Sequence, residues 1–313
     1  DGFKTFVTAG NWDVADNWFP AGVPAIEDQV SIEAAATIPA GVVATAKRVD
    51  LNGGSILIKD GGQLKQGAAT LRVTVEKEIV GYTGTTDHYY FISSPFSGRT
   101  LYEESGTWSR VDNLLDGEYD FYAFDATEEY EWINYKANPT HISFESDNGN
   151  AGLMYGEGYL YANANQEGTT LQFVGTTGKS INYSEAIDYT YDATSTDNWN
   201  GWALVGNFFT CDAYINYVDE QGNVLEADFY TLNNGSRYTL SESNVALPPC
   251  AGAFINYSAT GKVQYSTEAP ANSKRTGMIN INLSRANESL SQARLRFGQG
   301  HNLGSMSFRN NSS

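Results

Sequence analysis

HYYFISSPFSG, residues 88–98, and GWALVGNFFTC, residues 201–211, are two aromatic, strand-like stretches that each end in a sharp break. Each is followed by a long polar segment and then by a glycine-rich return to strand. The return is GEGYLYANANQEGTTLQFVGT from Gly156 in one case and CAGAFINYSATGKVQYST from Cys250 in the other. The order of features is therefore the same twice: strand, break, polar segment, glycine, strand, turn, strand.

The two copies also align locally. Pairing residues 94–97 with 207–210, and residues 159–160 with 254–255, places apolar residues opposite apolar residues. A repeat decides how the rest of a fold is interpreted, so it takes precedence over any single residue. We predict a tandem duplication of one β-module. The alternative is chance, because short aromatic strands resemble one another.

The composition indicates strands joined by turns. The chain has 313 residues, with 20 Tyr, 31 Gly and only 3 Met, and a length of this kind accommodates two or three domains of about 100–150 residues each.

The formal charge is −18, from 37 acidic and 19 basic residues. It argues against binding to nucleic acid or to an anionic membrane surface, where basic patches supply the affinity. No apolar run reaches the roughly 18 residues of a membrane span, so we expect no membrane insertion.

The N-terminal segment, up to about Glu78, reads differently from the rest. Short strand-like pieces are separated by the glycine pairs Gly53-Gly54 and Gly61-Gly62, at nearly regular spacing. This pattern is typical of a β-solenoid, in which each rung buries its apolar side chains on the next. Aromatic residues near the start are expected to cap it: Trp12, Trp18 and Phe19. The alternative is a small β-sandwich with hairpins at the glycine pairs.

The predicted fold is all-β. A short N-terminal β-solenoid-like domain, residues 1–78, precedes two tandem related β-sandwich modules, residues 79–180 and 181–276. Alternating apolar residues from Leu71 predict the half-buried strand that leads into the first module. Residues 277–313 are expected to be the first strands of a further β-domain or a C-terminal tail. The chain stops without an apolar run that would close this last part, so we expect a parent protein that continues further.

Two cysteines, Cys211 and Cys250, both lie in the second repeat. One follows the first strand of this repeat and the other precedes a later strand. If these strands are neighbours, the two sulfurs can form a disulfide, which would indicate an oxidising compartment. The alternative is two unrelated buried thiols, and the sequence leaves both open.

No catalytic signature is present. The three histidines, His88, His141 and His301, lie in three different segments, whereas a zinc site draws on closely spaced ligands. The HExxH, CxxC and GxSxG motifs are also missing. A glycosidase needs only two carboxylates at a suitable separation, and so acidic a chain offers many pairs. We predict a protein without enzymatic activity.

The acidic turn of the first module is the one candidate metal site. Its residues lie close together in the sequence: Asp120, Asp125, Glu128 and Glu129. Calcium takes several carboxylate and carbonyl oxygens, so a calcium ion is the cofactor that this turn would hold. No D-x-D-x-D-G run occurs, and a solvated turn in an acidic protein is the ordinary alternative.

Binding residues are expected among the aromatic side chains in loop-rich stretches of the first module. An exposed aromatic ring can stack on a sugar or anchor a protein partner, although most aromatic side chains are buried. The candidates are Tyr102, Trp108, Tyr130, Trp132 and Tyr135.

Several stretches together resemble large secreted surface proteins of Bacteroidetes. These stretches are GNWDVADNWFPAGVP, TIPAGVVATAKRVDLNGGSILIKDGGQLKQG, VEKEIVGYTGTTDHYYFISSPFSG, GEGYLYAN, GWALVGNFFTC and INLSRANESLSQARLRFGQG. Proteins of that type carry a C-terminal sorting domain that the type IX secretion system recognises. The resemblance implies a secreted or outer-membrane-attached protein whose β-modules serve adhesion or accompany a peptidase. It carries no catalytic residue over to this chain.

The sequence thus predicts an adhesin-like or structural surface protein that binds a glycan or a protein partner on a host or neighbouring cell. The type IX secretion machinery would be a further partner, reached through a sorting domain that this chain lacks. One alternative is an accessory region of a secreted hydrolase, such as a peptidase or glycosidase. Another is a stalk that only spaces a distal domain from the cell.

Overall fold

The computed structural model describes residues 2–68, 70–82, 88–96, 99–100, 110–144, 152–233, 236–240, 245–270, 278–285 and 288–296. The fold is all-β, as predicted, and only two 3-10 turns, η1 (Ala15–Asn17) and η2 (Ile142–Phe144), are helical in this part. Neither of these turns is long and apolar enough to cross a membrane. The chain divides into two compact units, Asp1–Glu268 and Ala269–Ser313. The finer boundaries near positions 78, 180 and 276 stay predictions.

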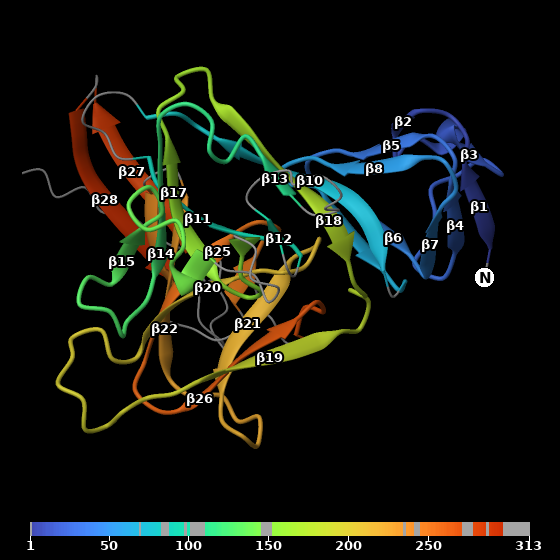
Figure 1. The fold of residues 1–313 in the computed structure, drawn as a ribbon. Coiled ribbons are helices and arrows are strands. Elements are labelled where there is room, and N and C mark those ends of the chain that lie inside the picture. Colours follow the sequence, from blue (N-terminus) through green and yellow to red (C-terminus); the bar gives the residue numbers. More distant parts are fainter. Residues whose placement is uncertain are drawn as a thin grey trace, which may run out of the picture. The chain divides into compact units, whose positions relative to one another are not determined.

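Parallel pairs join most strands of the chain up to Ile79, which we call the N-terminal region, and Figure 1 shows them in blue at one end of the first unit. The first parallel row is β1 (Phe3–Phe6), β4 (Gln29–Ile32) and β7 (Arg48–Leu51). The second row is β2 (Gly10–Asn11), β5 (Ala35–Ile38), β8 (Ser55–Ile58) and β10 (Leu71–Ile79). The third row is β6 (Val43–Ala46) and β9 (Gln63–Gln66). The short strand β3 (Trp18–Phe19) runs antiparallel to β1.

Successive strands of a row carry the same apolar positions. Val30 lies opposite Val49, Ala36 opposite Ile56 and Ala44 opposite Leu64, so the chain returns to each row at a nearly constant interval. All six side chains are buried. The glycine pairs separate strands of different rows, so they are not hairpin turns. Gly54 has no room for a side chain, because a Cβ atom would lie 2.4 Å from the carbonyl oxygen of Ala34.

Aromatic rings close the start of this region. The rings of Trp12 and Trp18 meet edge to face with centroids 4.7 Å apart, and Phe6 packs against Trp18 at 4.8 Å. The indole N–H of Trp18 donates to the carbonyl oxygen of Trp12 at 2.8 Å. Phe19, which we expected in the same cap, is 71% exposed.

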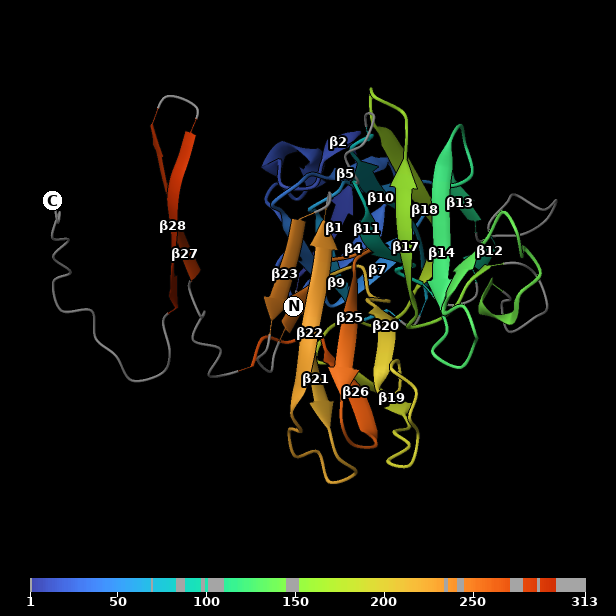
Figure 2. The same cartoon turned by 90° about the vertical axis from the view of Figure 1, so that its left-hand side faces the viewer.

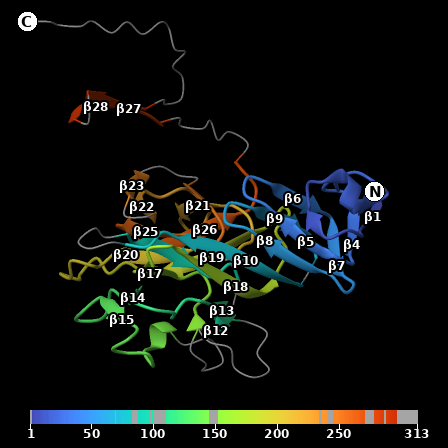
Figure 3. The same cartoon turned by 90° about the horizontal axis from the view of Figure 1, so that it is seen from above.

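The strand β10 leads out of this region as the sequence predicts, with Leu71, Val73 and Val75 buried on one face. It pairs antiparallel with β18 (Thr169–Thr177), which in turn pairs with β13 (Arg110–Asp112). Figure 3 shows the long pair of β10 and β18 between the N-terminal strands and the sheets of the later strands.

Two four-stranded sheets follow. The first has the order β11-β17-β14-β15, with bounds β11 (Tyr90–Ser93), β17 (Gly158–Asn163), β14 (Tyr119–Phe124) and β15 (Trp132–Asn134). The second has the order β20-β25-β22-β23, with bounds β20 (Trp202–Gly206), β25 (Gly252–Tyr257), β22 (Ala227–Asn233) and β23 (Ser236–Leu240). Figure 2 shows β22, β25 and β20 side by side.

The remaining strands complete the two units. A third four-stranded sheet has the order β19-β26-β21-β24, with bounds β19 (Ser184–Tyr189), β26 (Gly261–Ser266), β21 (Ala213–Val218) and β24 (Val245–Leu247). A small pair joins β12 (Arg99–Thr100) to β16 (Gly152–Leu153). In the second unit, β27 (Met278–Arg285) and β28 (Glu288–Arg296) form an antiparallel hairpin.

The backbones of the two four-stranded sheets touch each other directly. The Gly206 N–H donates to the carbonyl oxygen of Gly156 at 2.7 Å, and the Ser93 N–H donates to that of Cys250 at 3.1 Å. Gly206 permits this approach, because a Cβ atom there would lie 2.3 Å from the carbonyl oxygen of Glu157. We call the first unit up to about residue 180 its earlier half and the rest its later half. Main-chain hydrogen bonds as well as side chains therefore hold the two halves together.

A second junction closes the free edge of β9. On the side away from β6, the Leu64 N–H donates to the carbonyl oxygen of Thr210 at 2.7 Å. Further along the same strand, the Gln66 N–H donates to the hydroxyl of Ser180 at 3.0 Å, and the Ser180 N–H donates back to the Gln66 carbonyl oxygen at 2.9 Å. Residues from the later half of the unit thus act as the missing neighbour strand of β9.

The buried apolar side chains form two clusters. One runs from Phe6 to Phe173 and includes Cys250, and the other runs from Val205 to Tyr265 and includes Cys211. The two cysteines are both free and buried, so the considered disulfide does not form in this structure. The physical reason is that each thiol packs into a different cluster.

Candidate ligand-binding site

A continuous group of aromatic rings lies where the two four-stranded sheets meet. Phe254 of β25 stands at its centre, with ring centroids 4.7 Å from Phe124, 4.9 Å from Trp202 and 5.8 Å from Trp132. We call this group the aromatic cluster, and its members are Phe91, Phe124, Trp132, Trp199, Trp202, Tyr230 and Phe254. All of them except Phe254 are only partly buried, so the cluster presents ring surface to solvent.

Local turns position these rings. The hairpin of β14 and β15 pairs Phe124 directly with Trp132. Its turn is fixed by Asp125, whose backbone N–H donates to the Glu131 carbonyl oxygen at 2.8 Å. Asp125 Oδ1 also accepts the backbone N–H of Thr127 at 2.9 Å. An Asp side chain that bonds its own backbone two residues on is a stable turn device.

Gly201 positions the two tryptophans Trp199 and Trp202. Gly201 has φ +80°, and a Cβ atom there would lie 2.1 Å from the carbonyl oxygen of Tyr257. The chain between Trp199 and Trp202 can therefore lie against the backbone of β25, where the Tyr257 N–H donates to the Gly201 carbonyl oxygen at 2.7 Å.

The predicted binding residues that the structure describes lie in three different environments: one in the aromatic cluster, one exposed and one buried. Trp132 is a member of the aromatic cluster. Tyr130 is 76% exposed on the hairpin turn, outside the cluster. Tyr135 is buried, and its ring packs on Phe121 and Phe144. The remaining two candidates, Tyr102 and Trp108, lie outside the described residues.

A cavity of about 370 Å³ opens beside the aromatic cluster and shares two of its side chains, Phe124 and Trp202. Its walls come from the β14–β15 turn, η2, the segment before β17, and strands β19, β20 and β25. Its polar lining side chains are Asp125, Thr127, Ser143, Glu157, Tyr159, Tyr189, Trp202 and Tyr257. No Lys, Arg or His is among the described residues that line it.

Glu157 is the unusual group in this cavity. Its carboxyl has no hydrogen-bond or ion-pair partner among the described residues. Burial, and to a smaller extent the nearby negative charge of Asp125, raises the pKa of Glu157 to about 7. Desolvation favours the neutral form of a carboxyl, so Glu157 changes its charge near neutral pH.

The charge of Glu157 acts on several tyrosine phenols. Tyr189 lines the cavity, but its hydroxyl is buried and has no hydrogen-bond partner in the described structure, and the same holds for the hydroxyl of Tyr265. Burial holds the pKa of both phenols well above the usual value, and the Glu157 charge adds to this. Buried polar groups normally have a partner, so two unpartnered hydroxyls in this part of the structure need an explanation.

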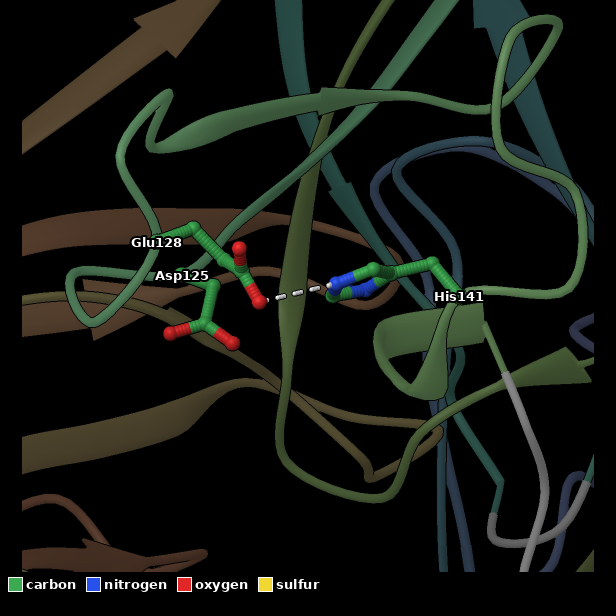
Figure 4. A group of neighbouring side chains, drawn as sticks. All are labelled: Asp125, Glu128 and His141. Atoms are coloured by element: carbon green, nitrogen blue, oxygen red, sulfur yellow. Dashed lines mark hydrogen bonds and ion pairs between the residues drawn. The ribbon is translucent and has the colours of Figure 1, made fainter.

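Asp125 and Glu128 face His141 at the edge of the site, as Figure 4 shows, and ligand atoms of the three residues lie within 4.8 Å of one another. His141 Nε2 lies 3.3 Å from Glu128 Oε1. On the other side of the ring, Nδ1 accepts the backbone N–H of Ser143 at 3.2 Å, so the proton of the neutral ring is on Nε2. A metal-bound histidine normally donates from its other nitrogen, and here that nitrogen accepts.

The structure therefore brings together only part of the predicted calcium set. Asp125 and Glu128 are neighbours, whereas Asp120 accepts the Tyr89 hydroxyl at 3.3 Å and Glu129 does not belong to the group. A calcium ion at this turn stays a prediction. His141 is the group member that the sequence pattern did not suggest.

Sequence reasoning missed most of this site. Trp199 and Trp202 stand only three positions apart in DNWNGW, a signal that was visible. Glu157 lies between two glycines in GEGY, and nothing local indicates that strands β19 and β20 enclose it. No protein-family model matches the chain, and no match was found among curated proteins or solved structures.

Proposed function

We propose that this protein binds a glycan, without catalysis, through the aromatic cluster. The observation that carries the proposal is the partly exposed group of rings around Phe254, contributed by both halves of the unit. The C–H faces of a sugar stack on aromatic rings, and Trp offers the largest ring surface at little entropic cost. Carboxylates and hydroxyls beside the rings supply hydrogen-bond acceptors for sugar hydroxyls.

The wider architecture fits a rigid display scaffold. The nearly constant interval at which the chain returns to each of three parallel rows supports a short β-solenoid at the N-terminus. The orders β11-β17-β14-β15 and β20-β25-β22-β23 run equivalently along the chain, which supports two tandem related sandwich modules. Loops on a stiff β-scaffold are a common place for binding residues.

We further propose that the protein acts outside the cell, on the surface or in secreted form. The acidic composition, with a formal charge of −18, and the resemblance to secreted surface proteins of Bacteroidetes support this location. Export by the type IX secretion system belongs to the same proposal. Protease treatment of intact cells tests it, because a surface protein is cut and an intracellular protein stays uncut.

A second function, glycoside hydrolysis, is favoured by one observation. Asp125 and Glu157 line the same cavity, and the pKa of Glu157 is about 7, which suits a general acid. Release of reducing ends from oligosaccharides by the wild type, and its loss in Glu157→Gln, would establish hydrolysis. It would exclude the non-catalytic proposal.

Calorimetric titration with neutral oligosaccharides chosen from a glycan array tests the binding proposal. Trp202→Ala is expected to weaken binding about tenfold, because one aromatic contact contributes about 1–1.5 kcal/mol. Tyr130→Ala is the matched control, since it removes an exposed ring outside the cluster. An array without any bound glycan contradicts the proposal, as does an equal loss in both variants.

A further inference from the structure

The ionisable carboxyl and basic groups that line the cavity beside the aromatic cluster are all acidic among the described residues. Asp125 and Glu157 supply two carboxyls, and no basic side chain stands among its described lining residues. The rings of Phe124, Trp202 and Tyr257 line the same space. Carboxylates together with aromatic faces form the environment that attracts ammonium ions, by charge-assisted hydrogen bonds and by cation–π interaction.

Some hydrogen-bond acceptors in this cavity have no donor among the described residues of the protein. The Glu157 carboxyl, which lines the cavity, makes no hydrogen bond or ion pair to the described residues. Asp125 Oδ1 accepts both donors of Thr127, and Oδ2 has no hydrogen bond of its own to the described residues. Two carboxyl groups are therefore free to accept N–H donors of an ammonium ion, whereas a neutral hydroxyl would leave the charge of the Asp125 carboxylate uncompensated.

We propose that the ligand is a glycan with an unacetylated amino group, and that its ammonium ion binds in this cavity between Glu157 and Asp125. The inference rests on the proposed glycan-binding function, because Trp202 and Phe124 belong both to the aromatic cluster and to the cavity wall. A sugar ring stacked on the cluster can place its amino substituent against Glu157.

Protons are coupled to this binding. An ammonium ion stabilises the charged carboxylate, so it lowers the pKa of Glu157 and releases a proton. Affinity for the amino glycan rises with pH until the amine itself loses its proton. The groups that face Glu157 are Asp125, Tyr159, Tyr189 and Tyr265, and His141 stands next to Asp125.

A pair of oligosaccharides separates this inference from the function on which it rests. Hexamers of glucosamine and of N-acetylglucosamine differ only in the acetyl group. Calorimetric titration of the wild type is expected to give at least about a tenfold tighter Kd for the glucosamine hexamer, the size of one charge-assisted contact. In Glu157→Gln only Asp125 remains to pair with the ammonium, so the ratio of the two Kd values falls toward one, and in the control Tyr130→Ala it stays unchanged.

Each outcome is decisive. Equal affinity of the wild type for both hexamers refutes the amino-group inference and leaves glycan binding standing. Absence of binding for either hexamer and for every other array glycan refutes both. If a lysine-rich peptide binds instead, with loss of binding in Glu157→Gln, the partner is a protein and the inference is overturned. A thermal unfolding curve of Glu157→Gln ensures that the variant is folded.

Discussion

Gly206→Ala tests how the two halves of the first unit fit together. The added methyl carbon would lie 2.3 Å from the carbonyl oxygen of Glu157 and 2.4 Å from Cβ of Ser93. Both atoms belong to or sit next to the backbone, so they cannot swing away. Gly206 has no positive φ, and the effect of the substitution is therefore purely steric.

The size of the expected loss in unfolding free energy follows from the close packing of the backbone around Gly206, which leaves no room for a methyl group. The Gly206 N–H holds the Gly156 carbonyl oxygen at 2.7 Å, and β20 is paired with β25 over its whole length. Overpacking of such a site destabilises by about 3 kcal/mol. In a unit of this size, the loss corresponds to a fall in Tm of roughly 6 °C or more.

Differential scanning calorimetry measures this shift, and Gly222→Ala is the control. Gly222 has φ +81° and open space around it, so a methyl group there causes only the strain of the left-handed conformation, about 1 kcal/mol. A Tm of Gly206→Ala equal to that of the wild type or of Gly222→Ala would refute the close contact between the two halves.

Three further predictions concern stability and reactivity. The folded-state pKa of Glu157, about 7, lies above its ordinary 4.5, so the stability that this group contributes is lost as pH rises through that window. Urea titrations should show a loss on the order of 2 kcal/mol there, and Glu157→Gln should lack it. Lys59→Met removes the ammonium that lies 2.7 Å from the buried Glu76 carboxylate, and it should destabilise by about 2 kcal/mol in guanidinium unfolding. An unchanged midpoint would contradict this. Burial raises the pKa of the Cys211 thiol to about 12, and that of Cys250 is also raised, so iodoacetamide should label both only after unfolding. Labelling of the native protein, detected by mass spectrometry, would disprove their protection.

The strands were predictable because their signals are local. Alternation from Leu71 identifies β10, and glycine pairs mark the places where the chain changes row. The repeated pattern around residues 88–98 and 201–211 aligns β11 with β20 from the sequence alone. Period-two alternation and turn residues need no information about distant parts of the chain.

The site was less predictable because its residues meet across long sequence distances. Trp132 and Phe254 come from different halves of the first unit, yet their rings lie 5.8 Å from each other. Tyr135 was a binding candidate because it lies in a loop-rich stretch, but η2 supplies Phe144, which buries its ring. The partners of an aromatic or acidic side chain depend on tertiary packing, which a single sequence does not reveal.

The covered edge of β9 has a consequence for how the chain is made. Ser180 and Thr210, which cover this edge, leave the ribosome long after Leu64 and Gln66, the residues that they bond. A nascent chain that ends before them presents an open β-edge, the surface on which strands of other molecules add. Synthesis of this protein therefore has a vulnerable interval, which closes only when the later segment arrives.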